Sequence, residues 1–264
     1  MRHGGLALFN GVLFYSKNVK AKAIKKNGKL TVTHTISHIT PVRKKTIGFK
    51  IDQFLGNLPF IRGAWLMLKT FLTAWKLLIF LFVISFLYLF LFTPDITNDS
   101  SYFNIEYYFY VISICMILIV AFYITKLGKY HAAEHMTSNC YLNDLELTVE
   151  NVRKQSRIHR ACGTNLVTFL CLVSFVLWII PYTRDINELL EIIITWSISY
   201  ELFIIEDKRV KKFLKPIYQI GSFLQYVVFT SKPNDEQLIV AIASFKTMER
   251  YQKEWNDKKN INKI

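Results

Sequence analysis

Four long apolar stretches constrain this chain more than any other feature of its sequence. They run over about 70–92, 107–125, 164–182 and 186–205. A hydrocarbon core of roughly 30 Å needs about 20 mostly apolar helical residues, because each residue rises only about 1.5 Å along a helix. The sequence therefore predicts a mainly α integral membrane protein with about four transmembrane helices.

Basic residues gather in alternate segments between these stretches. The chain carries 33 Lys and Arg against 19 Asp and Glu, a net charge of +14, although 52% of its residues are apolar. Lys and Arg are frequent before the first stretch, within 126–163 and after 206, whereas 94–106 has none. Because basic loops stay on the cytoplasmic side, we predict a multi-pass protein of the cytoplasmic membrane with both termini cytoplasmic. The charge also suits the lipid bilayer and its anionic inner-leaflet lipids as partners, and it needs no nucleic acid to explain it.

This topology divides the chain into three regions. They are a basic cytoplasmic region at 1–63, a four-span membrane domain at 64–206 with a cytoplasmic loop at 126–163, and interfacial and amphipathic helices with a basic tail at 207–264. The segment 213–229 is apolar but contains Lys215, Pro216 and Gly221. We expect it to form a helix that lies on the inner leaflet or dips into it.

Two segments outside the predicted spans have clear local patterns. Residues 20–26 and 29–36 alternate polar and apolar side chains around Asn27-Gly28, a pair that supplies the positive φ of a type I′ turn and so predicts a small N-terminal β-hairpin. After Ser231-Lys232-Pro233, apolar residues recur at helical spacing and predict an amphipathic helix of about 20 residues that docks on the hairpin or on a partner. Its apolar face comprises Leu238, Ala241, Ile242, Phe245, Met248, Tyr251 and Trp255.

The start of the chain and the middle loop give two smaller signals. Gly4, Gly5 and Gly11 surround a short apolar run. Glycines at this density indicate backbone packed closely against another segment, and a flexible terminus is the alternative. In the loop, Thr148 is placed to cap a helix over 149–158.

The pattern His131-Ala132-Ala133-Glu134-His135 carries the sharpest chemical signal. On a helix, the two histidines lie one turn apart on the same face and can share a divalent metal, of which zinc is the best candidate. Glu134 could then accept a proton from a water at the metal, as in the inverted zinc-hydrolase motif. The alternative is a pair of interfacial histidines that bind headgroups or cap a helix.

Three further potential ligands are predicted to return to the same depth. His159 and Cys162 directly precede the third apolar stretch, and both residue types bind zinc or iron. Glu201 lies about 6 Å inside the fourth stretch by helix rise, where an unpaired carboxylate is costly. The alternative for Glu201 is pairing with Arg157 or Arg160.

The four cysteines fit no disulfide framework. Cys115 and Cys171 fall inside predicted spans, and Cys140 and Cys162 fall on the reducing cytoplasmic side, so free thiols or metal ligands are expected. Cys140 could be a fourth ligand, a thiol nucleophile activated by His135 or His159, or an inert buried thiol.

These residues resemble the YqhQ family, bacterial membrane proteins of a domain of unknown function that are often labelled predicted metal-dependent enzymes. The resemblance covers most of the chain and implies a bacterial membrane location and a metal site at the same His and Glu residues. Its carriers are Gly4-Gly5 through Gly11-Val12, Pro59 through Gly63, His131 through Tyr141, Leu147 through His159, Cys162 through Thr164, Ser199 through Glu201 and Asn234 through Ala243.

Two functions from different classes follow. The first is a metal-binding protein, with His131, His135 and one or two of His159, Cys162 and Glu201 as ligands. Glu134 would be its general base, and as an enzyme it would hydrolyse a peptide or lipid-linked bond. The alternative is a non-enzymatic membrane factor that docks a membrane-protein partner, such as insertion or quality-control machinery. The sequence has no Gly-rich phosphate loop and so gives no support to nucleotide chemistry.

Overall fold

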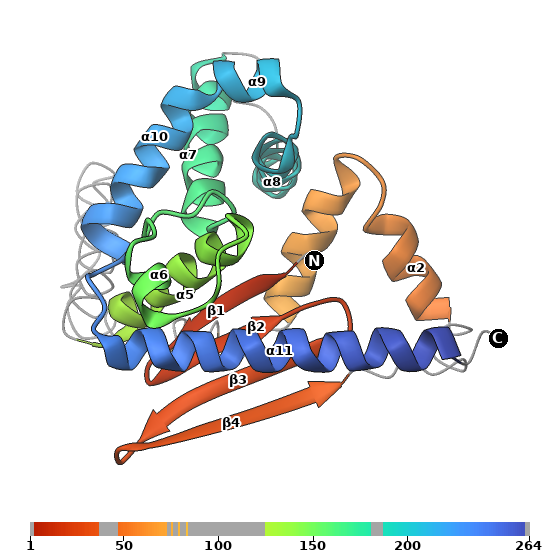
Figure 1. Cartoon of the computed structure of the whole chain (residues 1–264). Coiled ribbons are helices and arrows are strands. Elements are labelled where there is room, and N and C mark those ends of the chain that lie inside the picture. The colour runs from red at the N-terminus through yellow and green to blue at the C-terminus, as the bar shows by residue number, and fades with distance from the viewer. Residues whose placement is uncertain are drawn as a thin grey trace. The chain divides into compact units, whose positions relative to one another are not determined.

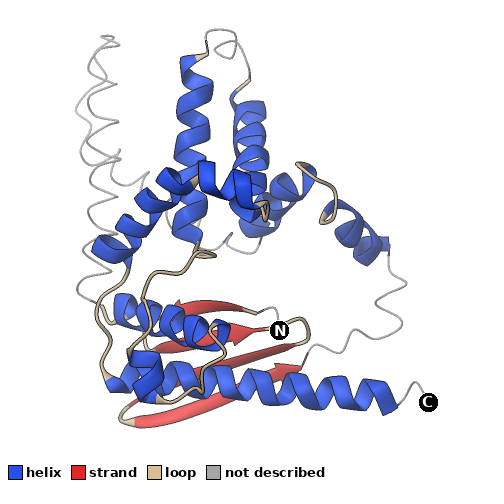
Figure 2. Cartoon of the chain, turned by 45° about the horizontal axis from the view of Figure 1, so that its top comes forward, coloured by secondary structure: helices blue, strands red, loops and turns tan. Residues whose placement is uncertain are grey.

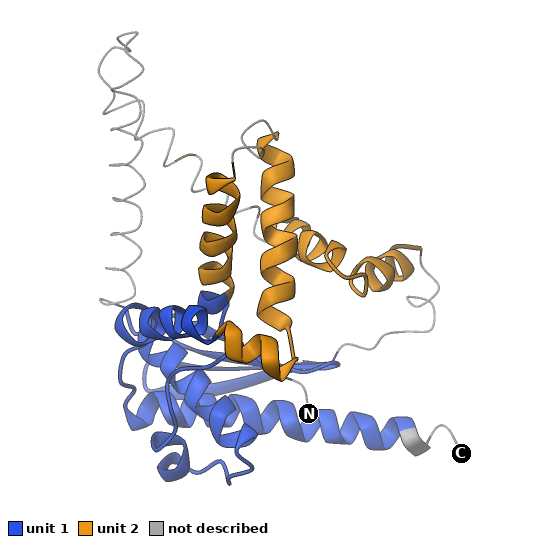
Figure 3. Ribbon diagram, turned by 90° about the horizontal axis from the view of Figure 1, so that it is seen from above, with its two compact units in different colours: residues 1–40, 116–165, 215–264 blue, residues 41–115, 166–214 orange. Residues whose placement is uncertain are grey.

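The computed structural model describes residues 3–36, 47–72, 75, 79, 83, 125–180 and 187–261. The chain divides into two compact units (Figure 3). Unit 1 comprises residues 1–40, 116–165 and 215–264, and unit 2 comprises residues 41–115 and 166–214. The predicted spans at 70–92 and 107–125 fall largely outside the described residues.

Unit 1 is built on a four-stranded antiparallel sheet in the order β1-β2-β3-β4 (Figure 1). Its strands are β1 (Gly4–Leu8), β2 (Gly11–Tyr15), β3 (Val19–Lys26) and β4 (Lys29–Ile36). Between β3 and β4, Asn27 and Gly28 both have positive φ, 50° and 77°, which is the type I′ geometry. The predicted hairpin is therefore confirmed, within a sheet that β1 and β2 make larger than expected.

One face of β2 and β3 is buried, whereas β4 is exposed on both faces along almost its whole length. Val12 and Phe14 of β2 and Ala21 and Ala23 of β3 are fully buried and lie in register with one another. Lys22, between the two alanines, is exposed. Successive side chains of a strand point to opposite faces, so this alternation gives the sheet one apolar face that must be covered.

Two helices of unit 1 cover that face. The long helix α11 (Asp235–Ile261) packs on β2 and β3, and α5 (Leu127–Leu142) packs on β1 and on α11 (Figure 1). Figure 2 shows α11 running along the strands from a second direction. The buried face of α11 includes Leu238, Ala241, Phe245 and Met248, and its start is capped by a hydrogen bond from Asn234 N to Gln237 Oε1. The predicted amphipathic helix and its docking on the hairpin are confirmed.

Unit 1 also contains three shorter helical segments in its described residues. They are α6 (Val149–Arg153), α10 (Lys215–Leu224) and the π-helix η2 (Gln225–Phe229). Thr148 caps α6 as predicted, because its side chain accepts a hydrogen bond from Asn151 N. The helix ends at Arg153, however, five residues before the predicted end at 158.

Unit 2 is helical in the residues that the structure describes. It contains α2 (Ile47–Leu55), a helical segment over 61–72, most of α7 (Gly163–Ile179), α8 (Glu188–Ile204) and α9 (Lys208–Phe213). The segment 61–72 packs closely on α8, since a Cβ at Gly63 would lie 2.9 Å from Tyr200 Cβ. Asp52 joins α2 to the same segment by accepting hydrogen bonds from Trp65 and Lys69.

The predicted integral membrane fold with four transmembrane helices is wrong. Over the part of the chain that the structure describes, no helix has both the length and the apolar character that crossing a membrane requires. The stretches predicted as the third and fourth spans form α7 and α8, of 17 residues each. Such a helix is about 25 Å long at about 1.5 Å per residue, against a hydrocarbon core of roughly 30 Å.

The same finding overturns the predictions that depended on the four spans. These are the multi-pass topology and the location in the bacterial cytoplasmic membrane with both termini cytoplasmic. The helices end at local signals: Asn187 caps α8 by accepting a hydrogen bond from Leu189 N, and the backbone leaves the helix at Ile205. Apolar composition identified the helices but not where they begin and end.

Candidate metal centre

Helix α5 places four polar side chains of unit 1 in one stripe. His131, Glu134, His135 and Ser138 are spaced by three, one and three residues, which brings them to one face of the helix. Tyr130, Ala133, Met136 and Cys140 of the same helix belong to the apolar core. The predicted helix through the two histidines is confirmed, and it is buried on both its polar and its apolar side.

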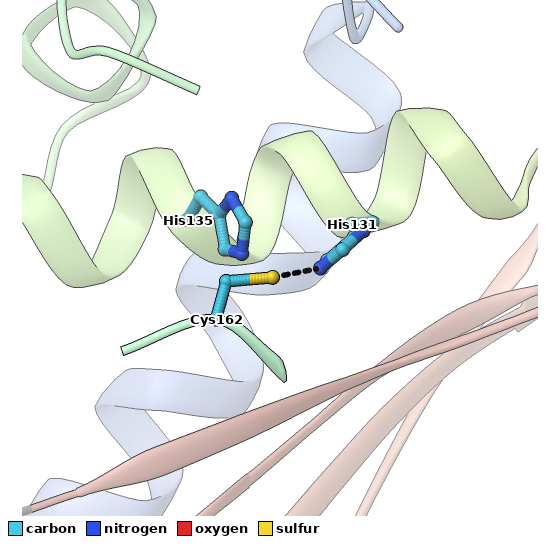
Figure 4. A group of neighbouring side chains, drawn as sticks. All are labelled: His131, His135 and Cys162. Carbon is cyan, nitrogen blue, oxygen red and sulfur yellow. Dashed lines mark hydrogen bonds between the residues drawn. The ribbon is translucent and has the colours of Figure 1, made fainter. Parts of the chain in front are cut away.

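Three of the predicted ligands lie together in unit 1. One donor atom each from His131, His135 and Cys162 is within 4.8 Å of the other two. Figure 4 shows both imidazole rings on one side of α5, with the Cys162 sulfur next to them. Cys162 directly precedes α7, and its Sγ lies 3.5 Å from His131 Nε2. These residues form a group that could hold a metal ion.

Backbone carbonyls fix the tautomer of both histidines. Nδ1 of His131 lies 2.9 Å from Phe229 O, and Nδ1 of His135 lies 2.7 Å from Arg157 O. A carbonyl oxygen can only accept, so each Nδ1 carries the proton and each Nε2 of the neutral ring keeps its lone pair. Metal-bound histidines are held in this way in other proteins. The donor atoms are therefore oriented before any ion arrives.

The π-helix η2 helps to hold this arrangement through hydrogen bonds at both of its ends. Its last residue, Phe229, supplies the carbonyl for His131, and the side chain of its first residue, Gln225, accepts a hydrogen bond from His159 N at 2.9 Å. Asn165 donates to Arg160 O at 2.8 Å and so holds the same loop. Short π-helices are frequent at functional sites, and this one contributes polar groups from both of its ends.

Burial keeps the imidazoles of the site neutral. It lowers the pKa of His131, and it lowers the pKa of His135 to about 3, where the neighbouring His131 adds to the effect. Burial also lowers the pKa of His159 to about 4, with His3 as the next cause. Neutral imidazole is the form that binds a metal. For the Cys162 thiol, burial raises the pKa, and metal coordination is the interaction that deprotonates such a group.

Glu134 is a buried carboxyl group beside these donors. It is 6% exposed, and its Oε2 lies 3.5 Å from His135 Nε2. Burial raises its pKa to about 8, and a long hydrogen bond from Ser138 only partly opposes this. Strand β1 leaves room for the carboxyl group because residue 5 is glycine: a Cβ there would lie 2.1 Å from Glu134 Oε1.

The site opens into a cavity of about 400 Å³ in unit 1. The lining residues come from His3 and β1, from the end of β2, from α5, and from the segment that leads into α7. They are His3, Gly4, Gly5, Leu6, Ala7, Tyr15, Leu127, His131, Glu134, His135, Ser138, His159, Ala161, Cys162 and Gly163. Glu134 is the one carboxyl group among the described residues of this lining, which contain no Lys or Arg.

Two other predicted site residues lie in unit 1 but outside the group of three. The His159 ring borders the cavity, with its centroid 5.5 Å from that of His135. Cys140 is fully buried in the apolar core, with its thiol directed at the carbonyls of Leu145 and Glu146. Burial raises the pKa of this thiol, which favours the inert form over a thiolate nucleophile.

Glu201 belongs to unit 2 and has a full set of partners there. Its Oε1 accepts hydrogen bonds from Phe60 N at 2.8 Å and Arg62 Nε at 2.7 Å, and its Oε2 accepts one from Arg62 Nη2 at 2.5 Å. The Arg62 guanidinium lowers the pKa of this carboxyl group. The expected alternative to ligation, an arginine partner, is thus present, but the partner is Arg62 rather than Arg157 or Arg160.

Sequence reasoning missed several residues of the site. His3 and Ser138 line the cavity and lie 3.3 Å apart through Nε2 and Oγ, and Gln225 and Asn165 position the loop. The glycines at the chain start did give a signal, since Gly5 packs against Glu134 as their density suggested. The sequence carried no signal for the polar residues that hold the site, because they are separated from their partners by up to 135 residues along the chain.

Together these features define a class of protein: an antiparallel sheet covered by two helices, with a candidate His, His, Cys metal centre between β1 and α5. The chain belongs to the family described as Protein of unknown function (DUF1385), which it matches over residues 61–251. All three grouped ligands and Glu134 fall within that range, whereas the sheet precedes it. The family resemblance seen in the sequence is confirmed.

One relative is the protein named Uncharacterized protein YqhQ of Bacillus subtilis (strain 168). It is 37% identical over 149 residues, which cover 53% of this chain and 46% of the relative. The chain therefore spans just under half the length of this relative. No solved structure matches the chain.

Proposed function

We propose that this protein is a zinc-dependent hydrolase whose metal is held by His131, His135 and Cys162. Two imidazoles and a thiolate suit zinc better than Mg²⁺ or Ca²⁺, which prefer oxygen ligands. The observation that carries the proposal is the convergence of three donor atoms within 4.8 Å of one another, with both histidines already in the tautomer that ligation needs.

Three protein ligands leave one position of a tetrahedral zinc site open, which distinguishes catalytic from structural sites. A zinc ion in such a site acts as a Lewis acid and lowers the pKa of a bound water to about 7. Glu134 is the residue that would take the proton from this water, because its carboxyl group reaches the same cavity. Burial raises the pKa of this carboxyl group to about 8, so without an ion it is mostly protonated at neutral pH. A cation held beside it would favour the carboxylate, which could then accept a proton and return it to the leaving group.

The remaining polar groups of the site would keep this geometry. Phe229 O and Arg157 O hold the histidine rings, and the Thr164 hydroxyl, 3.4 Å from Cys162 Sγ, can donate to the sulfur once it is a thiolate. The sequence predicted a peptide or a lipid-linked bond as the substrate, both because the site was placed at the level of the inner leaflet. We keep the peptide bond as the proposed substrate.

Metal analysis of the purified protein tests the ligand set. We expect about one zinc per chain in the wild type and almost none in a His131→Ala, His135→Ala double variant. Cobalt-loaded protein should show a thiolate charge-transfer band that Cys162→Ser abolishes. His34→Ala is the matched control, because His34 is exposed and stacks on Tyr251 of α11. Equal, near-zero metal in the wild type and the double variant would contradict the proposal and favour the non-enzymatic, partner-docking alternative.

A further inference from the structure

Strand β1 is an edge strand, and half of its backbone groups face away from the sheet. Among the described residues its one strand partner is β2, and a two-residue turn joins Leu8 to Gly11. Such a turn makes these two residues a hydrogen-bonded pair. By alternation, Leu8, Leu6 and Gly4 direct their N–H and C=O groups toward β2, and Ala7 and Gly5 direct theirs outward.

These outward groups have no backbone partner within the described residues. An exposed strand edge of this kind is a template on which another chain can add a strand. Native proteins usually block such edges with charges or proline, but β1 has the sequence Gly-Gly-Leu-Ala-Leu and contains neither. Gly4, Gly5 and Ala7 place no large side chain beside this edge, and all three residues are partly exposed.

The same strand lies beside the candidate metal centre. Residues 4 to 7 line the cavity together with His131, Glu134 and Cys162. Contact at Gly5 is close, because only the absence of a Cβ allows Glu134 Oε1 to approach this strand. A chain paired with the edge at the usual strand spacing of about 4.8 Å would therefore run past the carboxyl group that we assign as the base.

The lining also disfavours the main alternative substrates. Lys and Arg side chains are the main groups that recognise phosphate-bearing ligands, and the described lining has neither, although the first residues of α5 and α7, Leu127 and Gly163, do border the cavity. A polypeptide backbone needs only matched N–H and C=O groups, which a bare strand edge provides. The site thus offers main-chain recognition where it lacks charge recognition.

We infer that the outer edge of β1 docks an extended polypeptide segment as an added strand and presents its peptide bond to the metal centre. This inference rests on the proposed function, since it names the substrate class of the same site. The main chain of the bound segment would supply most of the affinity. Only every second residue of that segment would point its N–H group at β1.

A binding experiment with an inactive variant tests the docking. Full-length, zinc-loaded Glu134→Gln protein is titrated with fluorescein-labelled degenerate decapeptides, and the tightest binder is resynthesised with one N-methyl amide at a time. We expect about tenfold weaker binding for methylation at alternate residues of the bound stretch, and little change at the residues between them. The inference is overturned if methylation changes binding equally at all residues, or if no peptide in the pool binds.

Two proline variants test the strand itself. Ala7→Pro removes an outward N–H group of β1 without removing a bond to β2, and it should weaken the same peptide about tenfold. Val32→Pro is the matched control: in β4, which a two-residue turn joins to β3, residue 32 also points its N–H group outward, at the opposite edge of the sheet. Equal peptide binding by both variants overturns the inference.

The outcome for docking is distinguishable from the outcome for the proposed function. Hydrolysis of the selected peptide and of p-nitrophenyl acetate is measured with zinc-loaded wild type and with Glu134→Gln. If methylation weakens binding at every second residue but hydrolysis does not depend on Glu134, the docking is supported and the hydrolase proposal is overturned. Glu134-dependent hydrolysis with a flat methylation scan supports the hydrolase and overturns the docking.

Discussion

Each of the two units contains a glutamate that is at least partly buried, and the pKa values of the two carboxyl groups are shifted in opposite directions. Glu134 of unit 1 forms no ion pair with any described Lys or Arg, and burial raises its pKa to about 8. Glu201 of unit 2 is held by Arg62 and by Phe60 N, and the guanidinium lowers its pKa. The family resemblance included both residues.

The contrast separates a reactive carboxyl group from a structural one. A carboxylate with three charge-assisted or backbone hydrogen bonds has its charge fully compensated, and it joins the segments that donate to it. A buried carboxyl group without such donors keeps the capacity to exchange a proton near neutral pH, and groups of this kind cluster at functional sites. The sequence alone predicted Glu134 as a general base and Glu201 as a candidate metal ligand, and their partners in the structure are what separate a reactive carboxyl group from a structural one.

The largest effect is expected from Glu134→Gln. The substitution removes the proposed base, so peptide hydrolysis by the zinc-loaded protein should fall about 10²–10⁴-fold. Zinc content should stay at the wild-type level, because Glu134 is not one of the three grouped ligands. Glu201→Gln is the control, and it should lose stability but keep its rate. Equal rate losses in the two variants, measured at equal zinc content, would remove the distinction between the glutamates.

Arg62→Met should give the next largest effect, on stability. It leaves Glu201 partly buried without its cation, and we expect the free energy of unfolding to fall by about 2–3 kcal/mol. Urea denaturation followed by circular dichroism measures the change. The control is Arg153→Met, whose ion pair with Asp235 has the same 2.5 Å distance but side chains that are 52% and 60% exposed, against 31% and 17% for Arg62 and Glu201. An exposed pair contributes about 0–1 kcal/mol, so similar losses in both variants would argue against a structural role for Glu201.

Gly5→Ala, which places a methyl group against Glu134, should have a smaller effect on stability. The new methyl group would lie 2.1 Å from Glu134 Oε1, and overpacking of this kind costs about 1–3 kcal/mol. Gly48→Ala is the control, since nothing lies within 4 Å of a Cβ at that helical position. Alanine there should leave stability unchanged or raise it by about 0.5–1 kcal/mol. The melting temperature of each variant is measured by thermal unfolding and compared with that of the wild type. If Gly5→Ala and Gly48→Ala have equal melting temperatures, the close approach of Glu134 does not require glycine at position 5.

Local patterns in the sequence predicted local structure correctly. Asn27-Gly28 determined the hairpin, Thr148 the cap of α6, and the recurrence from Leu238 to Met248 the buried face of α11. The i, i+4 spacing of His131 and His135 predicted two of the three grouped ligands. In each case, the residues that form the pattern are close together in the sequence.

Features that depend on distant contacts or on helix ends were not predictable in this way. The apolar stretches at 164–182 and 186–205 matched the length of a span, but α7 and α8 stop at 17 residues. The partner of Glu201 lies 139 residues away at Arg62, whereas the predicted depth of the apolar stretches had suggested Arg157 or Arg160. Both residues do lie in short segments that carry the family resemblance, Pro59 through Gly63 and Ser199 through Glu201, and that coincidence was the available signal.

Acid titration of Glu201 should give the smallest effect. Its pKa is near the ordinary value of 4.5 in the unfolded chain and lower in the folded protein, because Arg62 donates to it. Between these values the unfolded state binds more protons, so the stabilisation is present above about pH 4.5 and is lost as pH falls through the folded pKa. The melting temperature of the wild type should therefore exceed that of Glu201→Gln by a constant amount from pH 7 to 5, and the difference should shrink below pH 4.5. A difference that stays constant down to pH 3 would mean that the carboxylate charge is not what Arg62 recognises.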